Sequence, residues 1–100
     1  MKHFVLTYHY VKDYMQRRDA FRAEHLARVR QAVDEGRILA AGVLPEEPSA
    51  LIVFYAESAE AARAFAEGDP YFKGGLISSY EVSDWVVAAG VDALVHPSCA

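Results

Sequence analysis

One helical face in the first half of the sequence combines basic residues with a histidine. Arg18, Arg22, His25 and Val29 recur every three or four residues, so a helix would place them on one side. Charge on a buried face is unfavourable unless it is paired or used. Two guanidinium groups could hold an anion there while His25 moves a proton. Alternatively, the arginines extend over the edge of a sheet and His25 is a hydrogen-bonded core histidine.

A second feature is the dipeptide Asp69-Pro70, which follows an alanine-rich segment. Aspartate is a favoured helix N-cap and proline is favoured at the first helical position, so Asp69 could cap a short turn through Phe72. A carboxylate can also orient a catalytic histidine. The two roles are compatible, and the sequence leaves both open.

Other polar residues carry weaker signals. The histidines at positions 3, 9, 25 and 96 have no partner at metal-site spacing, so we predict no metal site. Gly74-Gly75 is not followed by the Lys-Ser/Thr of a phosphate loop and is expected to permit a turn. Tyr8 belongs to a series of tyrosines at strand spacing, a pattern more often found in a core. We expect no cofactor.

Composition restricts the class of protein. The chain has 100 residues, 53% of them hydrophobic, which suits one soluble globular domain. A net charge of −4 does not favour nucleic acid as a partner, and no apolar run is long enough to span a membrane. The single cysteine, Cys99, cannot form an internal disulfide, and the first residues are too polar for a secretory signal. We therefore predict a cytoplasmic protein.

The pattern of the sequence predicts six main elements in the order β-α-β-β-α-β. Strands are expected over residues 4–10, 37–44, 50–56 and 76–87. Helices are expected after Asp13 as far as Glu35, with Gly36 as the C-cap, and from Ser58 to Gly68. In the first strand, Phe4, Leu6, Tyr8 and Tyr10 would share one face. This order is that of the ferredoxin-like fold, an α+β fold with both helices on one face of a four-stranded antiparallel sheet.

The other face of this sheet would have no cover within the chain. Residues 51–55 are apolar at every position, so both faces of this strand are apolar. The uncovered face would therefore be a large apolar patch. Packing against the same face of a second subunit would cover it, so we predict a homodimer.

At the level of motifs, the sequence resembles YciI-like (YCII-related) proteins over residues 1–87. The shared pattern comprises Phe4 to Tyr8, Arg18-x-x-x-Arg22-x-x-His25-Leu26, residues 36–42, Asp69-Pro70-Tyr71-Phe72, Gly75-Leu76 and Trp85. The resemblance implies a dimeric α+β barrel with a cleft that contains a histidine and an aspartate, at the positions of His25 and Asp69. Some members are similar to a dehydrochlorinase of chlorinated hydroxyquinols, and the superfamily includes muconolactone isomerases and small monooxygenases. Residues 88–100 form a tail outside the resemblance.

Two functions fit this combination of residues and resemblance. In the first, His25 is a general acid/base oriented by Asp69, and Arg18, Arg22 and Tyr8 hold a small anionic or phenolic substrate. Elimination or isomerisation without a cofactor is the expected reaction class, that of a lyase or isomerase. In the second, the same cleft binds a small molecule without turnover, as an accessory or sensing module.

Overall fold

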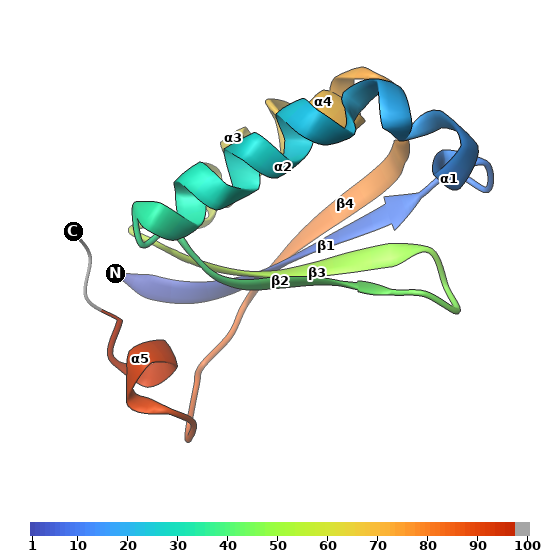
Figure 1. Cartoon of the computed structure of the whole chain (residues 1–100). Coiled ribbons are helices and arrows are strands. Elements are labelled where there is room, and N and C mark those ends of the chain that lie inside the picture. The colour runs from blue at the N-terminus through green and yellow to red at the C-terminus, as the bar shows by residue number, and fades with distance from the viewer. Residues whose placement is uncertain (98–100) are drawn as a thin grey trace.

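The computed structural model describes residues 1–97, which form a four-stranded antiparallel sheet and five helices. Cys99 and the end of the predicted tail lie outside the described residues. The elements are, in chain order, β1 (Lys2–Tyr10), α1 (Tyr14–Arg17), α2 (Asp19–Asp34), β2 (Ile38–Leu44), β3 (Ser49–Ala56), α3 (Ala59–Glu67), α4 (Pro70–Lys73), β4 (Ile77–Asp84) and α5 (Asp92–Val95). The strand order is β2-β3-β1-β4 (Figure 1). This is the predicted ferredoxin-like α+β fold.

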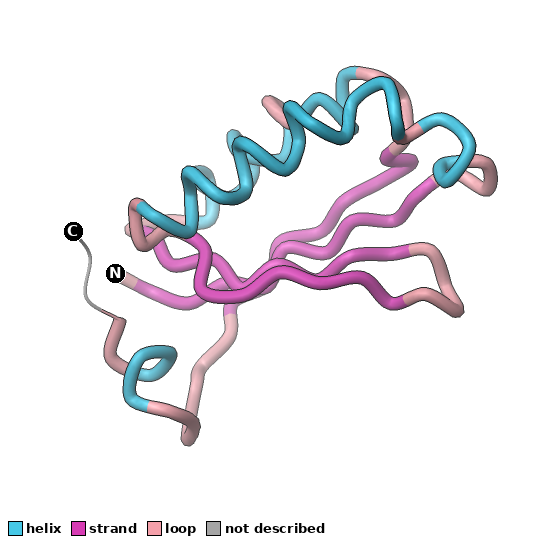
Figure 2. Tube along the Cα trace, viewed as in Figure 1, coloured by secondary structure: helices cyan, strands magenta, loops and turns pink. Residues whose placement is uncertain are grey.

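Strand β1 organises the core because it pairs with both β3 and β4. Its side chains alternate as predicted, and Phe4, Leu6, Tyr8 and Tyr10 are buried. The helices α2 and α3 lie together over this face of the sheet (Figure 2). Small side chains let α3 approach closely, since Ala62 and Ala66 are both fully buried. Tyr8 and Tyr10 consequently point into the layer between the sheet and the helices.

The predicted first helix is broken at Arg18 into α1 and α2. The single turn of α1 buries Tyr14, whose ring stacks on Tyr10 with centroids 4.2 Å apart. That contact joins two segments in space, and helical periodicity does not reveal it. The other end of α2 is as predicted: Gly36 has a positive φ of 77°, and its N–H donates to the Val33 carbonyl.

Strand β4 is shorter than predicted and ends at Asp84 instead of residue 87. Its partner β1 begins at Lys2, and the last paired residues are Phe4 and Asp84, so little strand remains for β4 to pair with. One further hydrogen bond, from Trp85 N–H to the His3 carbonyl, extends the contact. The chain then leaves the sheet and reaches α5, which lies on the side away from α2 and α3 (Figure 1).

Two glycines shape the turn between α4 and β4, as expected for Gly74-Gly75. Gly75 has a positive φ of 79°, which favours glycine. A Cβ atom on Gly74 would lie 2.6 Å from the Phe21 ring of α2. The absence of a side chain therefore lets α4 pack directly against α2.

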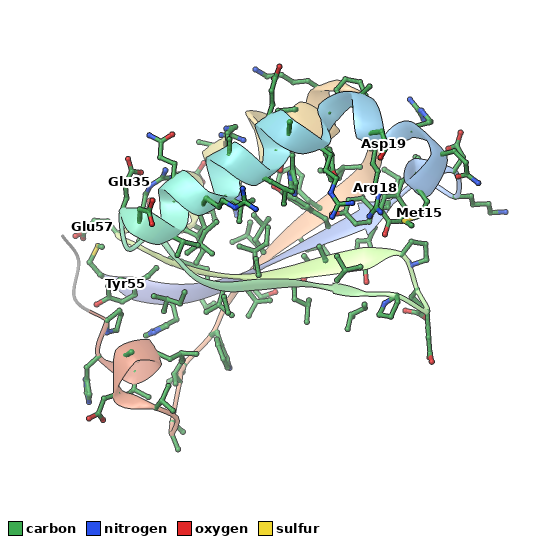
Figure 3. The ribbon with its side chains drawn as sticks, in the orientation of Figure 1. Met15, Arg18, Asp19, Glu35, Tyr55 and Glu57 are labelled. Carbon is green, nitrogen blue, oxygen red and sulfur yellow. The ribbon has the colours of Figure 1, made fainter. Side chains whose placement is uncertain are left out.

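The uncovered face of the sheet carries both apolar and polar groups. Leu51 is 39% exposed, and Val5 and Val53 are half-buried. Tyr55 projects from the same face (Figure 3), and its ring lies 5.0 Å from that of His3. The homodimer that would cover this face stays a prediction. No helix within residues 1–97 is long and apolar enough to cross a membrane.

Candidate active site

Asp69 is the N-cap of α4 and is completely buried. Its Oδ1 accepts a hydrogen bond of 2.9 Å from the Tyr71 N–H, and Pro70 occupies the first helical position. The predicted capping role is therefore observed. Capping uses only part of the carboxylate, because two oxygens can accept about four hydrogen bonds.

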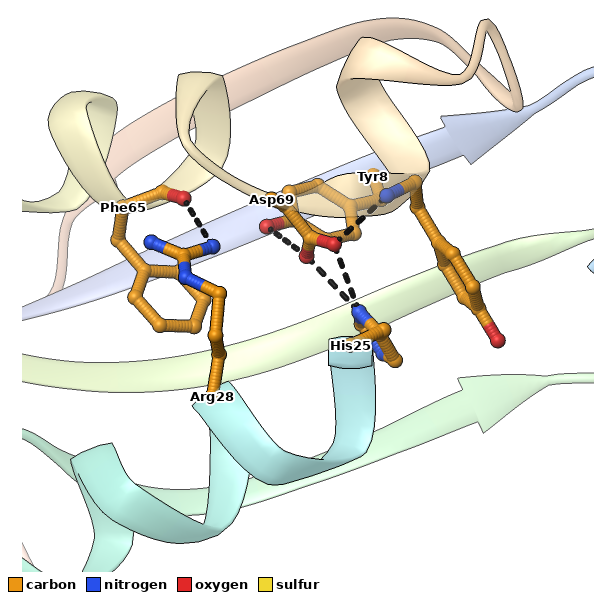
Figure 4. A network of polar contacts seen from close by, with 6 residues as sticks. Tyr8, His25, Arg28, Phe65 and Asp69 are labelled. Atoms are coloured by element: carbon orange, nitrogen blue, oxygen red, sulfur yellow. Dashed lines mark hydrogen bonds and ion pairs between the residues drawn. The ribbon is translucent and has the colours of Figure 1, made fainter. Parts of the chain in front are cut away.

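His25 reaches the remaining part of the carboxylate from α2. Its Nδ1 lies 2.8 Å from Oδ1 and 2.9 Å from Oδ2 of Asp69. The two residues are 44 positions apart in the chain and face each other between α2 and α4 (Figure 4). The structure thus brings together the pair that was expected to act as a unit, whereas its catalytic role stays a prediction.

The Tyr8 hydroxyl is a third donor to the Asp69 carboxylate, after the Tyr71 N–H and His25. The Tyr8 hydroxyl donates to Asp69 Oδ2 over 3.0 Å, so the buried carboxylate accepts from Tyr8, Tyr71 and His25. An ionised carboxylate only accepts, and therefore the proton of neutral His25 lies on Nδ1. The Tyr71 ring stacks on the imidazole at 3.8 Å and 7°, which holds its plane. Nε2 is left as the nitrogen with a free lone pair.

A cavity of about 160 Å³ lies beside His25, between α2 and the sheet. Its walls come from β1, α2, β2 and β3 and are mostly apolar. They consist of Tyr8, Tyr10, His25, Leu26, Val29, Ala41, Gly42, Val43, Ala50 and Ile52. Of these lining residues, only the two tyrosines and the histidine have polar side chains. The site can therefore hold a small, largely apolar molecule next to one proton-transferring group.

The three predicted substrate-binding residues are placed differently. Tyr8 lines the cavity and also donates to Asp69. Arg18 is half-buried where α1 passes into α2 (Figure 3), and it is not part of the cavity wall. Arg22 is exposed, so the prediction that it lies on the buried face of the helix is wrong. Arg22 lies in the first turn of α2, and helical periodicity gives the direction of a side chain but not whether another element covers that turn. Whether either arginine binds a ligand stays a prediction.

Sequence reasoning missed Tyr10 and the β2 segment Ala41–Val43 as parts of the cavity wall. Tyr10 lies two residues after Tyr8 in β1, so the alternation of the strand places both side chains on the buried face. Burial alone does not tell whether a side chain packs in the core or lines a cavity. The small side chains of Ala41 and Gly42 leave space, and a Cβ atom on Gly42 would have no atom within 4 Å. Such space depends on how far α2 lies from β2, which no local pattern encodes.

Arg28 supports the site from behind. Its guanidinium lies 4.6 Å from the centre of the Phe65 ring and donates to the Phe65 carbonyl over 3.2 Å (Figure 4). This carbonyl belongs to the last turn of α3, where a positive charge is favourable. A Cβ atom on Gly68 would lie 2.9 Å from Arg28 Nη2, so a larger residue at this position would require the guanidinium to shift. The contact holds the last turn of α3, which ends at Glu67, two residues before Asp69.

The buried tyrosines of the site have strongly altered acidity. Burial raises the pKa of both Tyr8 and Tyr10 well above the usual 10.0, and the nearby Asp69 charge raises it further. Both side chains are consequently neutral hydroxyl donors at physiological pH. Neither can serve as a general base there.

Alkaline pH should destabilise the fold through these two tyrosines. A raised pKa in the folded state gives stability that is complete below the unfolded value, about 10, and is lost as the pH rises above it. Each group should lower the free energy of unfolding by about 1.4 kcal/mol per pH unit in that range. Urea unfolding of the native protein and of Tyr10→Phe at a series of pH values measures the slopes. The dependence of the unfolding free energy on pH should be weaker in Tyr10→Phe by the contribution of one tyrosine. Equal slopes in the two proteins would contradict the raised pKa of Tyr10.

Within the described part of the chain, no three histidine, cysteine or acidic side chains come together as a metal site.

Comparisons with known proteins place the chain in a family. A model of the YCII-related domain matches residues 1–86. Protein YciI of Escherichia coli is 36% identical over 80 residues, which cover 70% of this chain and 82% of that protein. An uncharacterised protein of Haemophilus influenzae is 31% identical over 84 residues, covering 74% of this chain and 86% of its own.

Solved structures share the fold at lower identity. The 5-chloro-2-hydroxyhydroquinone dehydrochlorinase TftG of Burkholderia phenoliruptrix, in complex with 2,5-dihydroxybenzoquinone, aligns with a TM-score of 0.75 and 22% identity. The alignment covers 86% of this chain and 95% of that one. A NIPSNAP domain protein of Burkholderia xenovorans aligns with a TM-score of 0.53 and 15% identity. With its domain match over residues 1–86 and its YciI relatives, this chain belongs to the YCII-related family.

Proposed function

We propose that the protein is a small enzyme that uses His25 for acid–base chemistry on a small phenolic or quinone-like molecule. The observation that carries the proposal is the contact of His25 Nδ1 with both oxygens of buried Asp69, at the wall of a cavity. This contact leaves Nε2 free to take a proton from a molecule in the cavity. The fold shared with a dehydrochlorinase supports the same reaction class.

The reaction would proceed by proton transfer alone. His25 Nε2 takes a proton from the substrate, and the imidazolium that forms is stabilised by the adjacent Asp69 carboxylate. In an elimination, the electron pair freed on the substrate forms a new double bond, and the leaving group departs with the pair of its own bond. In an isomerisation, the proton returns from Nε2 to a different atom of the substrate.

The apolar cavity wall defines the substrate class further. A planar ring would fit among Leu26, Val29 and Ile52, which offer only apolar surface. Among the described residues, no lysine or arginine lines this cavity. A compact, strongly hydrated anion such as phosphate is therefore disfavoured, because it would lose its hydration without gaining a cationic partner. An anion whose charge is spread over a ring, such as a phenolate, loses less hydration and is the better candidate.

Chloride release from 5-chloro-2-hydroxyhydroquinone under argon tests the proposal. We expect release by the native protein, and a rate lower by about 10²- to 10⁴-fold in His25→Gln, the usual size of general acid–base catalysis. His9→Gln is the matched control, because His9 pairs with exposed Glu81 on the other face of the sheet. Equal rates in the native protein and His25→Gln would overturn the proposal.

The alternative function is a binding module that uses the same cavity without turnover. Titration with 2,5-dihydroxybenzoquinone separates the two. Saturable binding that is weakened in His25→Gln, together with no release of chloride, would favour the binding module over the enzyme.

A further inference from the structure

Tyr10 lines the cavity, and no contact within the described residues uses its hydroxyl. Three lining residues have polar side chains, and two of them are engaged with Asp69: Tyr8 through its hydroxyl and His25 through Nδ1. The Tyr10 hydroxyl has no hydrogen-bond partner among residues 1–97. Every buried side-chain nitrogen or oxygen among these residues is paired, so the Tyr10 hydroxyl must be accessible rather than sealed in the core.

The ring that carries this hydroxyl is held on three sides. It stacks on Tyr14 at 4.2 Å and 14°, and meets Tyr71 edge-to-face at 6.1 Å and 78°. Tyr8 lies 6.3 Å away in a similar edge contact. Only 9% of Tyr10 is exposed. The hydroxyl is therefore a preorganised donor, because its position is fixed before any ligand arrives.

The Tyr10 hydroxyl is a neutral donor. Burial and, after it, the nearby Asp69 charge raise its pKa, and the Arg18 charge only partly opposes them. Tyr10 therefore stays protonated at neutral pH. The Tyr10 end of the site thus offers a donor, whereas the His25 end offers a lone pair on Nε2.

We infer that Tyr10 is a ligand-binding residue that donates a hydrogen bond to an oxygen of the substrate, separate from the group that meets His25. This inference rests on the proposed function and deepens it. Where this oxygen is a carbonyl conjugated with the atom that loses its proton to Nε2, the electron pair of the broken bond moves onto it. In an elimination the pair then returns to form the new double bond, and the leaving group departs with the pair of its own bond. The fixed Tyr10 hydroxyl stabilises the charge that develops on this oxygen. The substrate is consequently a ring with at least two oxygen substituents.

Two simple probes, phenol and hydroquinone, differ by the one hydroxyl group that this inference concerns. NMR titration gives their dissociation constants for the native protein, Tyr10→Phe and Tyr14→Phe. The native protein should bind hydroquinone about fivefold to tenfold more tightly than phenol, beyond the statistical gain from two equivalent hydroxyls. Tyr10→Phe should lose this preference. Tyr14→Phe should keep it, because Tyr14 is the stacked neighbour and does not line the cavity.

The outcomes separate the two levels of the proposal. A native protein that binds both probes with equal affinity, or a Tyr10→Phe variant that keeps the preference, overturns the role of Tyr10 and leaves the proposed function intact. A native protein that binds neither probe overturns the proposed ring-binding cavity and the role of Tyr10 with it. If Tyr10→Phe loses its native circular dichroism spectrum, the comparison of the two probes on the native protein decides.

Discussion

Asp69→Asn should reduce turnover by about 10⁴-fold, the loss seen when the carboxylate of a catalytic triad becomes an amide. In the native protein both carboxylate oxygens accept from Nδ1 of His25. The amide carbonyl of the variant is needed by the Tyr71 N–H, so the amide nitrogen takes the place of Oδ2, 2.9 Å from Nδ1. An N–H group there favours Nδ1 as an acceptor, and the proton moves to Nε2. The base is then blocked by its own proton.

Nitrogen-15 NMR of the imidazole ring measures this change directly. The native protein should show neutral His25 protonated on Nδ1, and Asp69→Asn should show it protonated on Nε2. Tyr8→Phe is the matched control, because it removes a partner of Oδ2 and leaves the carboxylate charge in place. If Asp69→Asn keeps both the native tautomer and the native rate, Asp69 acts only as a helix cap.

Asp69→Ala should lower the free energy of unfolding by about 2–6 kcal/mol, because each of two buried donors left without an acceptor costs about 1–3 kcal/mol. The substitution leaves the Tyr8 hydroxyl and the Tyr71 N–H without an acceptor in a region that water does not reach. Urea unfolding followed by circular dichroism gives the midpoint and slope from which this energy is obtained.

Ser58→Ala is the matched control for this measurement. Ser58 is also an N-cap, at the start of α3, but its side chain makes no capping hydrogen bond. Its loss should change stability by less than about 0.5 kcal/mol, as at most surface positions. Similar values for Ser58→Ala and Asp69→Ala would mean that the buried network around Asp69 contributes nothing beyond an ordinary helix start.

Local patterns predicted the parts of the fold that depend on neighbours in sequence. The alternation from Phe4 to Tyr10 identified the buried face of β1, and Gly36 identified the end of α2. The capping role of Asp69 followed from its residue type and from Pro70. In each case the physical cause lies within a few residues of the position concerned.

The rest depended on contacts between distant segments. The break at Arg18 accompanies the burial of Tyr14 against Tyr10. The exposure of Arg22 depends on which elements cover the first turn of α2. The pairing of His25 with Asp69 was expected from a family resemblance, since nothing in their spacing requires it. The sequence pattern placed Tyr10 in the core with the other aromatic residues of β1. Its place in the cavity wall, beside a Tyr8 hydroxyl that is already paired with Asp69, is visible only in the structure.

The carboxylate of Asp69 also ties the site to the order in which the chain folds. It joins His25, 44 residues earlier, and Tyr8, 61 residues earlier, across three separate elements. Local structure such as α2 or the β2–β3 hairpin can form early, but contacts of this sequence separation form only after long loops have closed. A nascent chain that ends before Asp69 cannot contain the pair. The site is therefore a marker of the completed fold, and hydrogen exchange at the Tyr71 amide should report unfolding of the domain as a whole.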